Sequence, residues 1–215
     1  MPRKPKWSYY PWTIPGSPPV NAPVALKCED LVLTHPSNIR RWSRLQGMIQ
    51  YADMSYLSCR ILMISSRAVH PVALYMAGQT IEKYLKAVLL TRQQRVPRVH
   101  KLTKLAELAG APFASQEFVK MCQHLERFDI AGRYDDHPLG GWQYSLNLLA
   151  FLDAFVTRCR RIVQMPSNTP NMVANLQRQD SGENPVMAAA VRALQDNNWH
   201  LNELVDPPDF RRVRD

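Results

Sequence analysis

Arg133 and His137 are the two side chains of this sequence that together could cleave RNA without a metal ion. They frame the segment RYDDH. Arg133 could hold a phosphate through two parallel hydrogen bonds, and His137 could take the proton of a ribose 2′-hydroxyl. The acids between them, Asp135 and Asp136, would repel the same phosphate. A loop held by an Arg–Asp ion pair, with Tyr134 packed and His137 exposed, is therefore the favoured alternative.

A second group of polar residues lies in AGQTIEKYLKAVLL, residues 77–90. Its apolar residues recur at the spacing of one helical face, whereas Gln79, Lys83 and Lys86 share another face. Glu82 precedes Lys86 by one helical turn, which predicts a surface ion pair worth about 0.3–0.5 kcal/mol. Gln79 and Lys83 are then left as candidate contacts for a ligand, with a plain solvated face as the alternative.

His100 and Lys101 should return close to Lys83 when the chain reverses after this helix. They make the same edge more basic, and the whole chain carries a net charge of +9 with a pI near 9.6. Such a charge favours an anionic partner: a nucleotide, RNA or the acidic residues of a partner protein. We predict contacts with phosphate or with partner acids from these residues: Gln79, Lys83, Lys86, His100, Lys101 and Tyr134.

No metal or cofactor site is predicted. The four cysteines are far apart and form no CxxC pair, which favours buried free thiols over a zinc site or a disulfide framework. Asp135, Asp136 and His137 are possible hard-metal ligands, but no distant set of partners for them is visible. His70 and His124 fall inside helical patterns and are interpreted as structural.

Helical periodicity explains how these residues are positioned. A first helix is predicted from an N-cap at Ser37 to Met63, a second from Pro71 to Gln93, and a third from Val99 to Ala109. Leu102, Leu105 and Leu108 should form the buried face of the third helix. A fourth helix should follow from Ser115, residues 128–141 are predicted to be a loop, and a long fifth helix should run from Trp142 to Val163. The absence of strand signals predicts an all-α, up-and-down bundle of about five helices.

The two ends of the chain differ from this bundle. Residues 1–36 contain eight of the 17 prolines and are predicted to be an extended basic arm. Residues 166–215 read as a polar linker followed by one short helix and a tail, which leaves 37–165 for the bundle. Arg158, Arg160 and Arg161 are interpreted as cations that complement the helix dipole. Because no apolar run has membrane-spanning length, we expect a cytoplasmic protein without membrane contact.

Three segments in this order resemble the HEPN domain (higher eukaryotes and prokaryotes nucleotide-binding): AGQTIEKYLKAVLL, VHKLTKLAEL and FDIAGRYDD before a long helix. The resemblance covers roughly residues 37–165. It implies an all-α bundle, usually a homodimer, with nucleotide- or RNA-directed roles, often beside a nucleotidyltransferase-like partner. Some members of the family are metal-independent ribonucleases of toxin–antitoxin systems.

The chain also departs from the pattern of those ribonucleases. Only three residues separate Arg133 from His137, and a tyrosine follows the arginine where those enzymes tend to have a small polar residue. Arg95 and His100 have a wider spacing, but they straddle the loop between two predicted helices. We therefore predict a homodimeric module that binds a nucleotide, RNA or a partner protein without catalysis. The alternative is a metal-independent, toxin-type ribonuclease that uses Arg133 and His137.

Overall fold

The computed structural model describes residues 36–65, 69–92, 95–134, 147–163, 170–178 and 184–205, and for residues 36–39, 128–134 and 147 it describes the backbone only. These ranges contain eight helices: α1 (Pro36–Ser65), α2 (His70–Thr91), α3 (Leu102–Ala109), α4 (Gln116–Tyr134), α5 (Asn147–Ile162), α6 (Met172–Arg178), α7 (Pro185–Gln195) and α8 (Leu201–Val205). No strand occurs in the part of the chain that is described. The predicted all-α class is thus confirmed.

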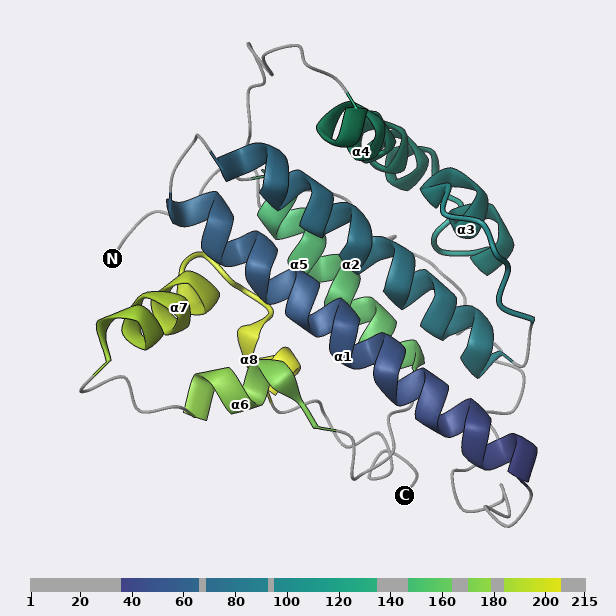
Figure 1. Cartoon of the computed structure of the whole chain (residues 1–215), viewed down its shortest axis with the longest axis horizontal. Helices are drawn as coiled ribbons and strands as arrows, with labels where there is room; N and C mark the ends of the chain where they lie inside the picture. Colours follow the sequence, from purple (N-terminus) through teal and green to yellow (C-terminus); the bar gives the residue numbers. More distant parts are fainter. Residues whose placement is uncertain are drawn as a thin grey trace, which may run out of the picture.

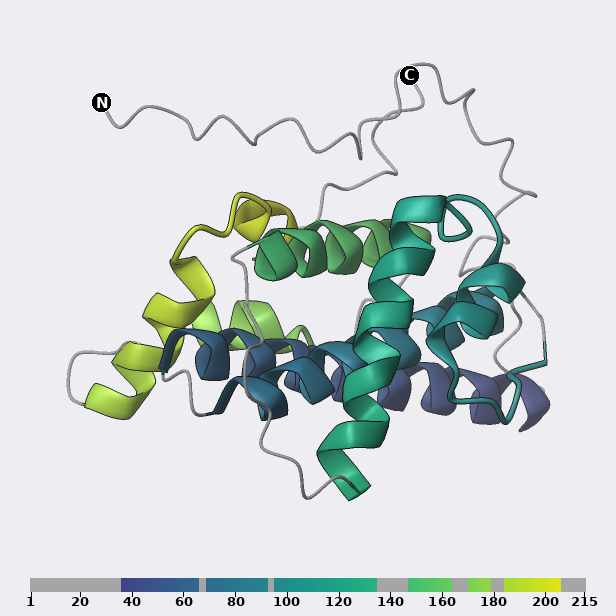
Figure 2. The ribbon, with the colours of Figure 1, turned by 90° about the horizontal axis from the view of Figure 1, so that it is seen from above.

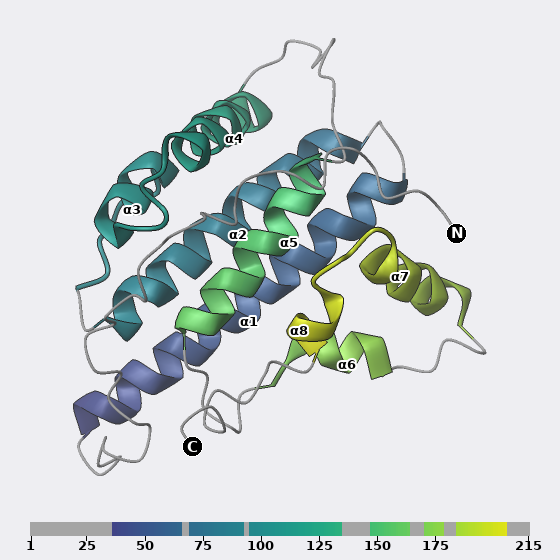
Figure 3. The same ribbon diagram turned by 180° about the vertical axis from the view of Figure 1, so that it is seen from behind.

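Helices α1 and α2 form a long antiparallel pair, and α5 lies against both of them (Figures 1 and 3). Helices α3 and α4 flank this three-helix centre on one side, with α4 crossing α2, and α6–α8 flank it on the other (Figures 1 and 2). The central position of α2 follows from its composition. Its apolar residues surround most of the helix from Ile81 to Leu90, and a helix that is apolar nearly all round is stable only when other elements cover it.

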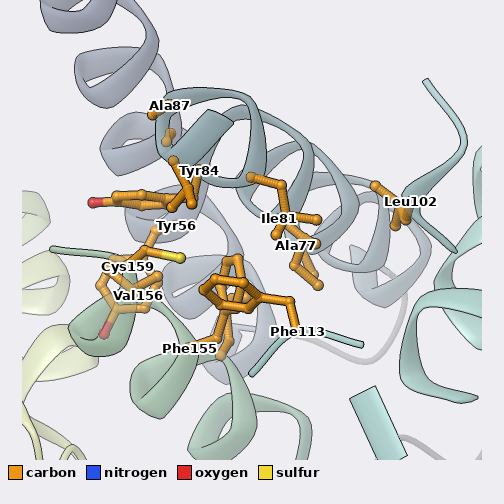
Figure 4. Packing of buried hydrophobic residues seen from close by; sticks show 14 of the residues in the cluster. Tyr56, Ala77, Ile81, Tyr84, Ala87, Leu102, Phe113, Phe155, Val156 and Cys159 are labelled. Carbon is orange, nitrogen blue, oxygen red and sulfur yellow. The ribbon is translucent and has the colours of Figure 1, made fainter. Parts of the chain in front are cut away.

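The core is built on the seams that the periodicity predicted. In α1 the buried residues include Leu45, Ile49, Ala52, Tyr56 and Cys59. Tyr84 of α2, Phe113 of the α3–α4 turn and Phe155 of α5 meet beside them (Figure 4), and Phe118 of α4 packs against Phe113 and Phe155. The Phe113 and Phe155 rings pack edge to face with centroids 5.7 Å apart, and Tyr84 meets Phe155 at 6.2 Å. Cys59, Cys122 and Cys159 are buried free thiols, as predicted, and Cys28 lies outside the described residues.

The boundaries of α1, α3 and α4 correct the sequence prediction. Helix α1 starts at Pro36, so Ser37 lies inside it, and α3 starts at Leu102, three residues after Val99. Gly110, with φ +66°, ends α3 as expected. Because α3 packs on α2 and α4 through residues that include Ala106 and Ala109, Leu108 is left 44% exposed instead of buried. Helix α4 continues through residues 128–134, which were predicted to be loop.

The C-terminal region contains more structure than its composition suggested. Helix α6 lies inside the predicted linker, and α8 follows the expected short helix, α7. Asn171 initiates α6 by accepting a hydrogen bond from the Ala174 amide, and Asn184 caps α7 in the same way through Val186 and Met187. The tail helices pack on α1 and α5 of their own chain. Polar composition misled the prediction because one buried face, as short as Val173 and Ala174, is enough to dock a helix.

No helix in the described ranges combines the length and apolar character needed to cross a bilayer.

Candidate functional site

Glu82 is the centre of the polar site on α2. Its side chain is only 4% exposed, and one of its oxygens, Oε1, lies 2.8 Å from Lys86 Nζ, 3.4 Å from Lys83 Nζ and 3.1 Å from His100 Nδ1. The predicted surface pair between Glu82 and Lys86 is therefore wrong in one respect, because both side chains are buried. His100 reaches Glu82 from the segment that returns to α2 after residue 95. Glu82 thus organises three basic groups.

The electrostatics of Glu82 reflect this arrangement. Burial raises the pKa of its carboxyl, but the hydrogen bond from Lys86 and the charges of Lys83, Lys86 and His100 outweigh burial, so that its pKa lies below the ordinary value. The carboxylate is consequently ionised at neutral pH. It holds the two lysines in place without neutralising both of them.

Lys83, Lys86 and His100 line a hollow of about 690 Å³ between α1, α2 and the segment before α3. Its walls combine basic residues with apolar ones: Arg44, Gly47, Met48, Tyr51, Lys83, Lys86, Val96, Pro97, Arg98 and His100. We call this the basic hollow. Arg44 and Arg98 are exposed and form no ion pair within the described ranges. Glu82 pairs with Lys83 and Lys86, and it is the one carboxylate among the described residues that does so. The four lysines and arginines therefore give the hollow an excess of positive charge.

The structure brings together three of the predicted ligand-binding residues, Lys83, Lys86 and His100. Gln79 is half-buried on α2 and does not line the basic hollow, and Lys101 is exposed just outside it. Sequence reasoning missed the contributions of Arg44 and Tyr51 on α1. Their exposure on a helix that packs along α2 is a tertiary property, and no local motif indicates it.

Of the predicted catalytic pair, only Arg133 falls within the described residues. Arg133 and Tyr134 lie in the last turn of α4, where only the backbone is described, and that turn is well separated from residues 95–101 (Figure 1). His137 is outside the described residues. The backbone therefore does not place Arg133 in one cleft with Lys83 and His100.

A second set of charged side chains is wholly buried on the opposite side of α1. Asp153 on α5 accepts hydrogen bonds from Arg60 Nη1 at 2.6 Å and from the Tyr56 hydroxyl at 2.7 Å. Arg60 also donates to the carbonyls of Ala193, at 3.0 Å, and Asp196 in the C-terminal region. We call these residues the Asp153 network.

Asp53 on α1 is the acceptor of a matching group, the Asp53 network. Arg160 Nη2 lies 2.6 Å from its carboxylate, and the Tyr84 hydroxyl donates to the same group. Arg160 further donates to Asn171 Oδ1 at 3.0 Å and to the Leu204 carbonyl at 2.8 Å. Arg160 lies in the last turn of α5, as the dipole interpretation expects, but that interpretation is incomplete because the side chain is 7% exposed and fully engaged in this network.

The two tyrosines of these networks act as neutral donors. Burial, followed by the charge of Asp153, raises the pKa of Tyr56 well above its ordinary value. Burial likewise raises the pKa of Tyr84, and the charge of Arg160 only partly opposes it. A signal for both networks was present in the sequence: Asp53 and Arg60 interrupt the apolar seam of α1, and Asp153 that of α5. Because both arginines already hold a carboxylate and main-chain carbonyls, we assign these networks a structural role.

Within the described ranges, no group of three or more His, Cys, Asp or Glu side chains is arranged to hold a metal ion.

Comparison with known proteins gives one match. A family model described as the HEPN domain matches residues 49–162, which is more than half of the chain. It spans the helices that carry Tyr51 and Lys83 and the segment that carries His100, and it ends with α5, before the tail helices. Searches among curated proteins and among solved structures returned no match.

Proposed function

This chain belongs to the HEPN family, and we propose that it binds the phosphate groups of RNA or of nucleotides in the basic hollow. Family membership supports a nucleotide- or RNA-related role in general terms. The specific proposal rests on one observation: Arg44, Lys83 and Arg98 line the same concave surface, together with the buried Lys86.

The chemistry of the hollow suits a phosphate. Arg44 and Arg98 make no ion pair in the described ranges, so their guanidinium groups are available for bidentate contacts with phosphate oxygens. Lys83 keeps about a third of its side chain exposed while Glu82 restrains it. A restrained cation loses less conformational freedom on binding than a free surface lysine does.

An acidic protein segment would compete for the same charges, but the hollow favours a nucleotide. Met48, Val96 and Pro97 supply apolar surface beside the basic groups. A nucleotide presents a planar, weakly polar base next to its phosphate, whereas an acidic peptide carries several separated carboxylates. Small-ligand sites typically have such apolar walls with a few convergent polar groups.

The decisive experiment is a titration of a labelled single-stranded oligoribonucleotide, followed by fluorescence anisotropy at several salt concentrations. We expect Lys83→Ala/Arg98→Ala to weaken binding by about tenfold or more and to reduce the slope of log K against log[salt] by about 1.4, because each lost phosphate contact on a single strand lowers the slope by about 0.7. Neither residue is fully buried, so the variant should fold.

The matched control is Lys104→Ala/Lys120→Ala, which removes the same formal charge from exposed positions on α3 and α4. It should change affinity by no more than about threefold, since distant charges are screened. Equal losses in the two variants would show that binding depends on net charge alone and would refute a site in the hollow. The absence of any salt-sensitive binding would refute the proposal altogether and leave an acidic protein partner to be tested.

We propose a binding role without catalysis, and the same titrations test it. RNA recovered from them without added metal should be intact. Cleavage that is lost in both Arg133→Ala and His137→Ala would instead support the toxin-type ribonuclease.

The homodimer and the nucleotidyltransferase-like partner are separate proposals that the family resemblance motivates. Sedimentation equilibrium of the full chain would test the homodimer, for which we expect twice the 24.7 kDa mass of one chain. A monomer at all concentrations would contradict it. For the partner, co-expression followed by size-exclusion chromatography should give a joint peak, and separate elution would argue against it.

A further inference from the structure

Tyr51 is the most exposed large aromatic side chain on the wall of the basic hollow. It lies on α1, and 65% of its surface is accessible, whereas Tyr56, little more than one turn later, is fully buried. Within the described ranges its ring packs against no other aromatic ring. A tyrosine on a helix surface contributes little to the core, so its position beside a cationic hollow calls for a physical account.

The space around the Tyr51 ring is open and partly apolar. Gly47 lies one helical turn before it, and a Cβ atom added at Gly47 would have no atom within 4 Å apart from its chain neighbours and the backbone of its own helix. Met48 lines the hollow on the same helix, and Val96 and Pro97 line it from the segment before α3. A flat group therefore has room to lie against the ring without displacing a side chain.

Positive charge borders this open space. Arg44 precedes Tyr51 by two turns on the same helix, and Lys83 and Arg98 belong to the other walls of the hollow. A ligand that places a planar ring on Tyr51 can thus place a phosphate on these cations at the same time. A nucleotide carries both a planar base and a phosphate, so it can make both contacts.

We infer that Tyr51 is a base-stacking platform, and that the basic hollow therefore selects single-stranded RNA or a free nucleotide over a bare phosphate or a duplex. This inference rests on the proposed function, because it assigns the base to the site whose phosphate contacts are proposed above. In a duplex the bases are already stacked on one another, so their faces are not available to a side chain. A bare polyphosphate has no ring to place there.

The test compares Tyr51→Leu with Tyr51→Phe. Leucine keeps an apolar side chain but removes the flat ring, and it should weaken binding of a single-stranded oligoribonucleotide by about 5- to 150-fold, the range found when stacking aromatics are removed. Phenylalanine keeps the ring and should bind within about threefold of the wild type. Trp199→Leu is the matched control, because Trp199 is an equally exposed aromatic, 72% accessible, between α7 and α8 on the other side of the bundle. It should leave the affinity unchanged.

Three probes separate this inference from the proposed function. The wild type should bind the single strand more tightly than a duplex of the same sequence, and AMP should compete for the hollow better than inorganic phosphate. Tripolyphosphate affinity should be the same in the wild type and in Tyr51→Leu, since its contacts are to the cations alone.

The outcomes are distinguishable. If Tyr51→Leu binds single strands as the wild type does, or weakens tripolyphosphate equally, the stacking role is refuted while salt-sensitive binding to the hollow stands. If the single strand, AMP and tripolyphosphate all fail to bind the wild type, the proposed function itself fails and the stacking role falls with it. If AMP binds but the single strand does not, a free nucleotide is the ligand. If the single strand binds but AMP does not, RNA is the ligand.

Discussion

The basic hollow and the two buried networks both contain arginines and both draw on α1 and α2, but they differ in how their arginines are paired. In the Asp153 and Asp53 networks, Arg60 and Arg160 each hold a carboxylate at 2.6 Å and further carbonyl oxygens of the C-terminal region. In the hollow, Arg44 and Arg98 have no carboxylate partner among the described residues. The state of pairing, more than the number of charges, separates a structural cation from one available to a ligand.

The physical reason is the cost of removing charge from water. A buried guanidinium must recover its lost hydration from the protein, and only a full set of acceptors does so. Arg60 and Arg160 therefore fasten the tail helices to the bundle, beyond the end of the HEPN match at residue 162. A cation at the rim of the hollow keeps its hydration, and a phosphate can replace that water.

The largest expected effect is on the buried side of this comparison. Asp153→Ala would leave Arg60 buried without its carboxylate and remove the acceptor of Tyr56, so we expect a loss of about 3–5 kcal/mol in the free energy of unfolding, measured with urea. Lys83→Ala in the hollow should cost less than about 1 kcal/mol in the same assay. Similar losses in both variants would contradict the distinction between the two regions.

A smaller effect is expected where the Asp53 network meets the tail. Asn171→Ala removes an acceptor of Arg160 and a donor to the Leu204 carbonyl, at 3.0 and 2.8 Å, and should cost about 1–3 kcal/mol. Amide hydrogens of α6 and α8 should then exchange faster, while those of α2 should change less. Asn175→Ala, which removes an amide side chain from an exposed position of α6, is the control and should change neither quantity. Unchanged exchange in the tail of Asn171→Ala would show that the network does not hold it.

Glu82 is buried but pairs with two lysines that line the hollow, and the pH dependence of stability tests this intermediate case. Its folded-state pKa is lowered, so its contribution to stability is complete above the ordinary value of 4.5 and is lost as the pH falls through the folded pKa. We expect Glu82→Gln to be less stable than the wild type by about 1–2 kcal/mol at pH 7. That difference should shrink as urea denaturation is repeated toward pH 3. A difference independent of pH would mean that the Glu82 charge contributes nothing.

The smallest effect is expected for an ion pair in water. Lys104 Nζ and Glu107 Oε2 lie 2.9 Å apart on α3, and both side chains are more than half exposed. Lys104→Ala should therefore change stability by no more than about 0.5 kcal/mol, measured by the same denaturation. A loss comparable to that of Asp153→Ala would show that distance, and not burial, governs these pairs.

Some features of the structure were predicted from the sequence and others were not. The seam of α1, the position of α2 and the stop at Gly110 were all predicted from spacing and glycine. The hollow was predicted only in part: Lys83, Lys86 and His100 were identified, whereas Arg44 and Tyr51 were not. Arg44 and Tyr51 belong to α1 and precede Lys83 by more than thirty residues. They become neighbours of α2 only when the two helices pair.

The sequence by itself determined the all-α class, the main helices and the family. These follow from a 3.6-residue period, from turn chemistry and from short ordered motifs, which are local properties of the chain. Only the tertiary structure decided which charged side chains are exposed to solvent. Glu82 meets His100 from the segment before α3, and Lys86 is buried beside residues of α1 and of that segment. Arg160 is buried because a tail more than ten residues later covers it. Burial depends on segments distant in sequence, so lysines and arginines in the same sequence pattern can lie at the surface or in the core.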